Sequence, residues 1–321
     1  MLFVIDPVEV LILETETSLL LVQEAAWRGH RCVSAHLPDL YLREGSARAR
    51  VRPIEVDLER RPPHRMGAPE DRALESFDLI LMRKDPPVDT DYAHGATILA
   101  AAGDEVPVVN DPIGILLSNE KLLPLEIPGA APPTLLTADP EVAAEFARAH
   151  EEVVVKPVNE FSGRGIIRLS TRGSALDADA VGALAAHRGR HVLVQRFLPE
   201  VERGDKRVFV LDGEPIGWVN RVPRPGSFLA NIHQGASVEP TELTDRERSV
   251  IEAARPILRE RGLEMAGFDF IGDWLTEINV TSPSAMRQID RVMGTRLETA
   301  VVDRLEALAA EGPRPVRWGR A

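Results

Sequence analysis

The chain has 321 residues, of which 44% are hydrophobic and 27% charged, and its formal net charge is -12. This length exceeds what one small core needs, so we expect two or three lobes. The negative charge argues against a nucleic-acid-binding protein, whose affinity rests on Lys and Arg paired with phosphates. No apolar run approaches the ~20 residues of a membrane helix, and the N-terminus lacks a basic leader followed by a hydrophobic stretch.

The number of cysteines also bears on the cellular compartment. Cys32 is the only cysteine, which rules out a disulfide within the chain and a cysteine-rich zinc site. It lies in "HRCVSA", the start of a predicted strand, where a small buried hydrophobic residue is a better interpretation than a nucleophile. We therefore expect a cytoplasmic protein.

The first third of the chain alternates between strand and helix patterns. In chain order the patterns predict a strand at 2–6, a helix at 18–30 and strands at 31–37, 77–87 and 106–111. The helix is expected to stop at Gly29. Residues 60–72, "RRPPHRMGAPEDR", are proline-rich, charged and aperiodic, and predict a surface loop. The alternation predicts an α/β domain with a parallel sheet over residues 1–118.

The chain changes character near Lys121, where the prolines of "NEKLLPLEIPGAAPPTLLT" indicate a connection into a second lobe. Beyond it the patterns predict a helix at 140–150, a strand at 153–158, a glycine turn at 159–165, a strand at 166–169, a second helix, a strand at 191–200, a hairpin at 206–222, a helix at 244–261 and a hairpin at 265–280. We divide this part into a central lobe at 119–198, a C-terminal lobe at 199–310 and a flexible tail at 311–321.

The stretch "WLTEINVTSPS" places two oxygen-bearing side chains inside an apolar run. In a strand Glu277 and Asn279 share one face, Ile278 and Val280 point into the core, and Asp269 on the preceding strand can lie across from the polar pair. Two carboxylates and an amide oxygen suit Mg²⁺. A solvated strand face, or a carboxylate paired with an arginine such as Arg287, is the alternative, and spacing alone leaves it open.

A second pattern, "VVVKPVNEFSGRGI", suits an anion. Lys156 ends an apolar strand and supplies a point charge, and Gly163 and Gly165 free the backbone N–H groups of the next turn. The P-loop spacing is absent. On this stretch alone an ordinary hairpin is the simpler interpretation.

The strand "HVLVQRFLPE" runs into an aromatic residue and a proline, which is typical of a hinge between lobes. Its backbone could contact an adenine edge, or it could be a buried strand with a proline stop. Further on, Asp205, Lys206 and Arg207 precede a strand, and Arg221 ends one. Such charge runs are usually only solvated, although arginines at strand ends also suit the stabilisation of transition-state charge.

The loop after Arg221 contains Pro and Gly and leads to Asn231 and His233. A mobile loop here could exclude water from an active site. His233 could act as a general base, but with no known neighbour it is better interpreted as a plain loop histidine.

The order of these features resembles that of ATP-grasp ligases, and residues 2 to about 305 resemble bacterial glutathione synthetases. "MRKDPP" at 82–87 and "TEINVTSP" at 276–283 are the most specific stretches, with "VVNDP", "NEKL" and "GDKRVFVLDGEPI" beside them. The resemblance implies an α/β chain of the ATP-grasp fold, in which a parallel-sheet domain precedes two α+β lobes that clasp ATP. It also implies an ADP-forming carboxylate–amine ligase that works through an acyl phosphate.

The resemblance assigns roles to individual residues. It implies ATP-binding roles for Lys121, Lys156, Gly163, Gly165, Gln195, Arg196, Phe197, Leu198 and Asp205. It implies catalytic roles for Arg207 and Arg221 and metal ligation by Asp269, Glu277 and Asn279. It implies substrate binding by Thr17, Ser18, Asn231, Ser282 and Pro283. The implied cofactor is Mg²⁺, or Mn²⁺, with ATP as co-substrate. The implied substrates are a small dipeptide and an amino acid, first γ-glutamylcysteine and glycine, and the implied assembly is a homotetramer without nucleic-acid or membrane partners.

The departures from the family fall on the substrate side. Glu14, Thr15 and Glu16 stand where family members carry a basic residue beside an Asp-[Thr/Ser]-Ser run. In the mobile loop, Leu229-Ala230-Asn231 replaces Arg-Gly-Asn, and "ANIHQGA" is similar to the loop of ATP-grasp ligases that add amino acids to peptides or proteins. A ligase of the same fold with another dipeptide or amino acid pair is therefore the alternative. An inactive ATP-binding scaffold is less favoured, because it has no reason to keep a costly charged cluster.

Overall fold

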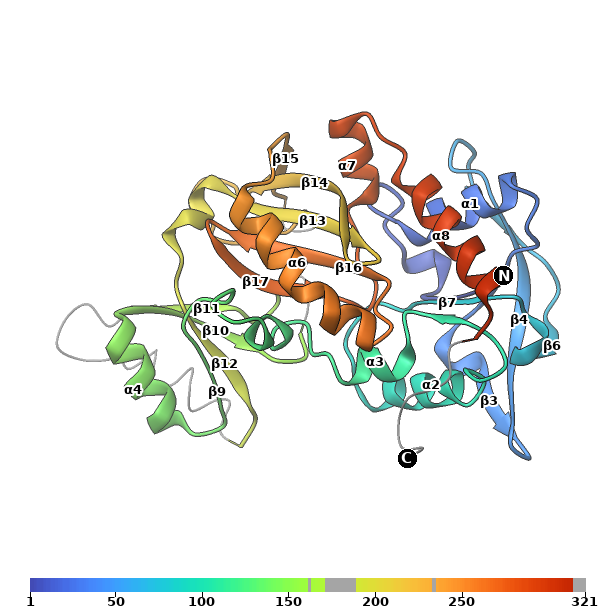
Figure 1. Cartoon of the computed structure of the whole chain (residues 1–321), viewed down its shortest axis with the longest axis horizontal. Coiled ribbons are helices and arrows are strands. Elements are labelled where there is room, and N and C mark those ends of the chain that lie inside the picture. The colour runs from blue at the N-terminus through green and yellow to red at the C-terminus, as the bar shows by residue number, and fades with distance from the viewer. Residues whose placement is uncertain (161–162, 171–188, 233–234, 314–321) are drawn as a thin grey trace.

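The structure is a computed structural model that describes residues 1–160, 163–170, 189–232 and 235–313. Three sheets follow one another along the chain, and the second and third face each other as two lobes (Figure 1). Three predictions fall outside the described residues: the second helix of the central lobe, His233, and most of the tail. The divisions at 118/119, 198/199 and 310/311 remain predictions.

The N-terminal sheet has the strand order β3-β4-β2-β1-β7-β8, with β5 and β6 on β4. Its strands are β1 (Leu2–Ile5), β2 (Val33–Ala35), β3 (Leu40–Arg43), β4 (Ser46–Val56), β5 (His64–Met66), β6 (Glu70–Ala73), β7 (Ile80–Arg83) and β8 (Val108–Val109). Its helices are α1 (Ser18–Trp27), α2 (Thr90–Ala100) and α3 (Pro112–Leu116). The pairs β2–β1, β1–β7 and β7–β8 are parallel, as predicted. All four residues of β1 are buried, as expected for a parallel strand covered on both faces.

The predicted surface loop at 60–72 is wrong. β5 and β6 lie in it and pair antiparallel with β4, a long strand that the sequence patterns did not reveal. Both short strands are mostly polar and none of their residues is fully buried, so they lack the apolar alternation by which a strand is recognised. Cys32 is buried one residue before β2, in agreement with its predicted role as a small hydrophobic residue.

The central sheet has the order β11-β10-β12-β9 and carries α4 on one face (Figure 1). Its elements are β9 (Thr134–Thr137), α4 (Pro140–His150), β10 (Glu152–Pro157), β11 (Ile167–Ser170) and β12 (Val192–Arg196). The bounds of α4 agree with the prediction, because the Asp139 side chain accepts a hydrogen bond from the Glu141 N–H and Pro140 opens the helix.

The C-terminal sheet has the order β15-β14-β13-β16-β17. Its elements are β13 (Asp205–Leu211), β14 (Glu214–Val222), β15 (Ser237–Glu239), α6 (Asp245–Glu260), β16 (Met265–Ile271) and β17 (Trp274–Asn279), followed by α7 (Met286–Met293) and α8 (Leu297–Glu311). Both predicted hairpins are present, and their turns place Gly213 and Gly272 at φ values of 78° and 57°. Thr244 and Glu247 form a capping box at the start of α6.

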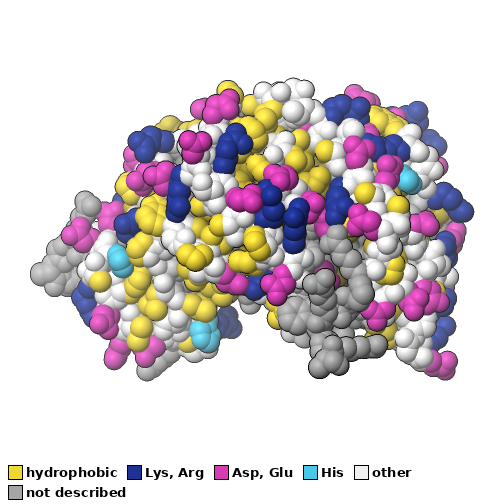
Figure 2. Space-filling view, viewed as in Figure 1, with side chains coloured by type: hydrophobic (Ala, Val, Ile, Leu, Met, Phe, Trp, Pro, Cys, Tyr) yellow, Lys and Arg dark blue, Asp and Glu magenta, His cyan; other side chains and the backbone are white. Residues whose placement is uncertain are grey.

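Short 3-10 helices complete the chain. They are η1 (Val8–Val10), η2 (Leu37–Asp39), η3 (Leu74–Ser76), η4 (Leu123–Glu126) and η5 (Pro199–Arg203). Among the described residues no helix is long and apolar enough to cross a membrane. On the face seen in Figure 2, acidic and basic side chains are interspersed rather than segregated.

The N-terminal and C-terminal sheets are joined by buried polar contacts. The Asn110 side chain, after β8, donates to the carbonyls of Met265 and Val280, both at 2.7 Å, and accepts from the Met265 N–H at 2.9 Å. Losing such a buried set costs about 1–3 kcal/mol for each unsatisfied group. α8 also returns to pack beside α1 (Figure 1), where Arg28 pairs with Asp303. These contacts fix the β16–β17 hairpin beside the N-terminal domain.

Candidate active site

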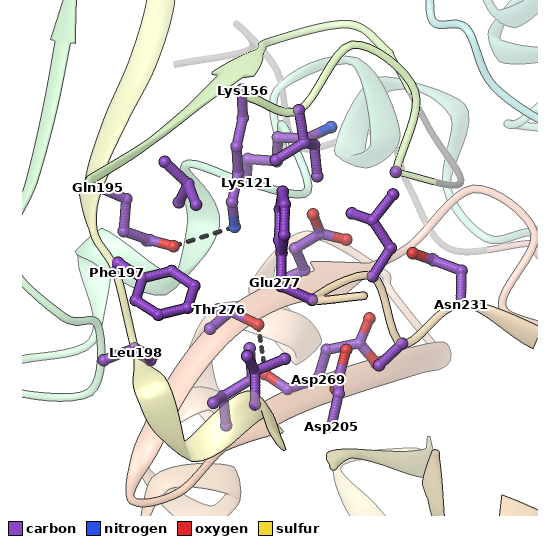
Figure 3. A pocket seen from close by; sticks show the side chains of 18 of the residues that line it. Lys121, Lys156, Gln195, Phe197, Leu198, Asp205, Asn231, Asp269, Thr276 and Glu277 are labelled. Atoms are coloured by element: carbon purple, nitrogen blue, oxygen red, sulfur yellow. Dashed lines mark hydrogen bonds between the residues drawn. The ribbon is translucent and has the colours of Figure 1, made fainter. Parts of the chain in front are cut away.

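Two cavities meet at the β16–β17 hairpin. The interlobe cavity lies between the central and C-terminal sheets, and its wall includes Lys121, Lys156, Gln195, Leu198, Asp205, Asp269 and Glu277 (Figure 3). The N-terminal cavity lies between the N-terminal domain and the C-terminal sheet, and its wall includes Asp6, Glu16, Thr17, Arg83, Asp85, Arg207, Arg221, Ser282 and Pro283. Of the residues that the structure describes, four line both cavities: Lys121, Arg164, Asn231 and Glu277.

A buried ion cluster forms the floor where the cavities meet. Strand register places Arg207 opposite Asp269 and Asp205 opposite Arg221. Arg207 donates to both oxygens of Asp269, from Nε at 2.5 Å and from Nη2 at 2.9 Å. Arg221 Nη2 lies 3.0 Å from Asp269 and 2.7 Å from Asp205. Two arginine charges are thus balanced by two carboxylates inside the protein, and this balance makes the burial tolerable.

The electrostatics of the two carboxylates differ. Burial alone would raise the pKa of Asp269, but the adjacent charges of Arg207 and Arg221 outweigh it and hold the pKa at about 2. Burial raises the pKa of Asp205 to about 6, although Arg221 acts in the opposite direction. Asp205 Oδ1 is buried without a hydrogen-bond partner among the described residues, and Asp205 lines the interlobe cavity. An acceptor left unpaired there suits a ligand hydroxyl.

The three predicted metal ligands converge. Glu277 lies directly opposite Asp269 across the hairpin, and Asn279 Nδ2 donates to Asp269 Oδ2 at 3.1 Å. Ile278 and Val280 are fully buried on the other side, as the strand pattern predicts. The alternative partner Arg287 bonds the Leu13 carbonyl instead.

The donor set fits a divalent cation that also binds phosphate. Asp269 is itself paired with arginines, so the alternative of an arginine–carboxylate pair holds for that residue. Within the described residues, the Glu277 carboxylate makes no hydrogen bond or ion pair. The same residues contain no group of three or more His, Cys, Asp or Glu side chains that could hold a metal ion, so the candidate set consists of two carboxylates and one amide. Two carboxylates and an amide leave positions for phosphate oxygens and water, which is the coordination Mg²⁺ favours.

Two buried lysines form the opposite wall (Figure 3). Lys156 Nζ donates to Gln195 Oε1 at 2.9 Å, and Lys121 Nζ donates to the backbone carbonyl of Glu160. Burial lowers the pKa of Lys156, while the charge of Glu277 across the cavity raises it. The structure therefore places both predicted phosphate-binding lysines opposite Asp269 and Glu277.

The glycine turn above the lysines requires its glycines. Gly163 and Gly165 have φ values of 74° and 69°. A Cβ at Gly163 would lie 2.9 Å from Asn231 Oδ1, and one at Gly165 would lie 2.9 Å from Pro157 Cγ. The turn thus packs closely both on β10 and on the loop after β14.

The predicted adenine segment, Gln195 to Leu198, lines the interlobe cavity, and Phe197 is buried there. The backbone N–H groups of Arg196 and Phe197 already donate to the carbonyls of Pro133 and Glu152. For the Leu198 N–H, the described part of the chain offers no backbone acceptor. Leu198 therefore keeps a donor that a ligand edge could use.

The predicted substrate residues gather at the N-terminal cavity. Thr17, Asn231, Ser282 and Pro283 line it, and the buried Thr17 Oγ1 finds no hydrogen-bond partner in the part of the chain that the structure describes. Ser18 lies behind the wall, where its Oγ accepts from Arg83 Nε at 3.3 Å. The cavity encloses about 520 Å³, enough for a small peptide.

Sequence reasoning assigned no role to several charged residues of these walls, four of which are Arg83, Asp85, Glu120 and Arg164. Arg83 is 2% exposed and donates to the carbonyl of Pro283 at 3.0 Å. Asp85 lines the N-terminal cavity beside it. The Glu120 carboxylate accepts hydrogen bonds from the backbone N–H groups of Val280 and Thr281 and from the Thr281 hydroxyl, and these bonds hold the cavity edge in place. An arginine at the end of the apolar run "LILMR" was the available signal for Arg83.

The chain is similar to known proteins over most of its length. The family description "Prokaryotic glutathione synthetase, N-terminal domain" matches residues 1–115, and "Prokaryotic glutathione synthetase, ATP-grasp domain" matches residues 120–294. A glutathione synthetase of Nitrosomonas europaea is 35% identical, covering 95% of this chain and 96% of its own. One of Parasynechococcus marenigrum is 38% identical, covering 96% and 99%.

Solved structures share the fold at low identity. D-cycloserine synthetase DcsG superposes with a TM-score of 0.64 at 14% identity, covering 95% of this chain and 99% of its own. The ATP-grasp ligase PsnB, complexed with a minimal precursor, gives 0.62 at 17%, covering 95% and 98%. The predicted ATP-grasp fold is confirmed. The chain belongs to the prokaryotic glutathione synthetase family and is an ATP-dependent, ADP-forming ligase.

Proposed function

We propose that the protein joins γ-glutamylcysteine to glycine with the consumption of ATP. One observation supports this most strongly: the interlobe and N-terminal cavities share a wall at Lys121, Asn231 and Glu277. A nucleotide in the first cavity and a dipeptide in the second bring a γ-phosphate and a carboxylate to the same point. The family relatives named glutathione synthetase supply the substrate identity.

In the proposed ATP site, the central lobe (119–198) and the C-terminal lobe (199–310) hold the nucleotide between them. Lys121 and Lys156 bind phosphate oxygens, and the turn at Gly163 and Gly165 covers them. The segment Gln195–Leu198 lines the adenine, and the Leu198 N–H donates to its edge. Asp205 Oδ1 accepts from a ribose hydroxyl. The N-terminal domain (1–118) contributes the dipeptide side.

Divalent cation is required for ATP use in this class, and we propose Mg²⁺, with Mn²⁺ as a substitute. Asp269, Glu277 and Asn279 would hold it, and it would neutralise phosphate charge. Arg207 and Arg221 would place guanidinium N–H donors beside the same point, while their charges stay balanced by Asp269 and Asp205.

The chemistry balances as two displacements. A donor carboxylate oxygen attacks the γ-phosphorus, the bond to the β–γ bridging oxygen breaks, and ADP leaves with the electron pair. The amine of the acceptor then attacks the acyl phosphate, loses a proton, and inorganic phosphate leaves. Thr17, Ser18, Asn231, Ser282 and Pro283 position the donor, and the loop after β14 excludes water.

The setting that we propose is cytoplasmic, in keeping with a lone buried thiol. The proposed assembly is a homotetramer. Its mass in solution, measured by light scattering, would be four times the 35.3 kDa of the chain. A monomeric mass would contradict the proposed assembly without touching the chemistry.

The test of the substrates mixes the enzyme with ATP, Mg²⁺, glycine and a panel of carboxylate donors, with phosphate release and product mass as readouts. We expect γ-glutamylcysteine and its thiol-free analogue γ-glutamyl-α-aminobutyrate to react, and α-glutamylcysteine to fail. Turnover with another dipeptide and none with γ-glutamylcysteine would refute the substrate assignment.

A different donor is the second candidate, because of one feature of the N-terminal cavity. Glu16 lines it in the region where the family resemblance implies a basic residue beside an Asp-[Thr/Ser]-Ser run, and Thr15 beside it is uncharged. A donor with a positive group at that end would be accepted better than γ-glutamylcysteine. Donors that differ only in that group would therefore separate the two candidates in the same assay.

A further inference from the structure

The junction of the two cavities holds a cation that the proposed mechanism does not yet use. Arg164 lies at the tip of the Gly163–Gly165 turn and lines both the interlobe and the N-terminal cavity. The positive φ values on both sides of it make a tight turn, and Asn231 packs against that turn. Arg164 therefore borders the junction of the two cavities, where the proposed function brings the two substrates together.

The charges below this point are already balanced. Arg207 and Arg221 are paired with Asp269 and Asp205, so the floor of the junction contributes little net positive charge. Glu277 adds a negative charge there. Two anions, a γ-phosphate and a carboxylate, must nevertheless approach each other at this point, and their repulsion has to be offset from elsewhere.

The central lobe adds further basic side chains to the walls of both cavities. Lys156 borders only the interlobe cavity, where it bonds Gln195. Lys121 and Arg164 border both cavities. The loop after β14 contributes the uncharged Leu229 and Ala230 to the interlobe wall, so it brings no positive side chain of its own at these positions.

We propose that Arg164 is a catalytic residue that binds the transferring phosphoryl group from above. Its planar guanidinium presents two N–H groups side by side, a geometry that matches two oxygens of a phosphoryl group or one of these and the attacking carboxylate. The interaction strengthens as charge develops on those oxygens during transfer from the β–γ bridging oxygen to the donor. This rests on the proposed use of ATP at the interlobe cavity and not on the identity of the donor.

The first experiment uses no donor. ADP affinity is measured calorimetrically with Mg²⁺, with and without aluminium fluoride, which mimics the transferring phosphoryl group. Wild-type protein should bind ADP more tightly in the presence of the fluoride. In Arg164→Gln, the factor by which fluoride increases the ADP affinity should be at least tenfold smaller than in the wild type. Its affinity for ADP alone should stay within twofold of the wild-type value. Arg148→Ala, which removes an exposed arginine on α4 of the same lobe, is the matched control.

The second experiment measures turnover with the best donor and glycine. Arg164→Gln should lower kcat about 30-fold or more, while the KM for ATP stays within threefold of the wild-type value. Arg164→Lys should recover part of the lost kcat, because lysine keeps the charge but lacks the planar fork. An unchanged kcat, or an ADP affinity that falls by the same factor with and without fluoride, would overturn the proposal. Failure of γ-glutamylcysteine as donor would instead refute the proposed substrate and leave the fluoride result intact.

Discussion

The two cavities are built in different ways. The wall of the interlobe cavity stands largely on paired strands: Lys156 on β10, Gln195 on β12, and Asp269 opposite Glu277 on β16 and β17. The wall of the N-terminal cavity comes mostly from strand ends and the segments after them, at residues 6–17, 83–86 and 281–285. Strand register fixes which side chains meet, whereas segments outside strands depend on tertiary contacts.

The two walls also carry charge differently. In the interlobe cavity, Asp205 and Asp269 are matched by Arg207 and Arg221 at 2.5 to 3.0 Å. In the N-terminal cavity, Arg83 is fully buried, burial lowers its pKa, and among the described residues no carboxylate lies within ion-pair distance of it. The first cavity therefore presents a set charge balance for one co-substrate. The second retains a positive group for a donor anion.

From this difference between the cavities, we expect the largest loss of activity in Glu277→Gln. The carboxamide keeps the shape but removes the charge that would hold the metal, so kcat should fall on the order of 10³-fold with every donor. The unfolding temperature should stay within a few degrees, because Glu277 makes no ion pair among the described residues.

The control for this variant is Asp273→Asn, an exposed carboxylate at the tip of the same hairpin, which should keep full activity. Activity and circular dichroism are measured on both. Near-normal turnover by Glu277→Gln would remove this residue from the metal site.

The next effect is that of Lys156→Ala. Loss of one charge-assisted contact to phosphate costs about 1.5–3 kcal/mol, so ATP should bind roughly 10- to 150-fold more weakly whichever donor is used. Lys206→Ala removes a lysine that points to the opposite face of β13 and pairs with Glu247, and its ATP affinity should be unchanged. Equal nucleotide affinity in wild type and Lys156→Ala would place Lys156 outside the site.

Much of the part of the site that lies on strands was predictable from the sequence. The alternation in "FDFIGDWLTEINV" correctly put Asp269, Glu277 and Asn279 on one face, and the Asp212-Gly213 and Gly272-Asp273 turns identified both hairpins. These signals are local, since side-chain direction in a strand follows from position alone. The fold class followed from the same pattern together with the family resemblance.

The rest could not be predicted because it depends on contacts between distant segments. Nothing near Arg83 in the sequence reveals that it meets Ser18 and Pro283. The polar strands β5 and β6 exist only because β4 pairs with them, so their own composition indicated a loop. Likewise, no local pattern shows that Arg164 borders two cavities.

A smaller effect, confined to the donor, is expected for Arg83→Lys. Lysine keeps the charge but loses the fork that bonds Ser18 and the Pro283 carbonyl, so the KM for the donor should rise about tenfold while the KM for ATP stays within twofold. Arg52→Lys, on an exposed position of β4, is the control and should leave both constants unchanged. An equal rise in both constants would contradict the separation of the two cavities.

The smallest change in KM is expected for Thr15→Lys, which introduces a basic side chain beside Glu16 at the rim of the N-terminal cavity. Thr15 is half-buried, and among the described residues its hydroxyl bonds only the Ile12 carbonyl, so the change should leave the fold intact. A charge at such a solvated position contributes about 0.5 kcal/mol, so the KM for an anionic donor should fall roughly twofold, and the gain should disappear at high salt. A change in the KM for ATP of the same size would show that the rim of this cavity also acts on the nucleotide. A salt-independent gain would indicate a direct, desolvated contact with the donor.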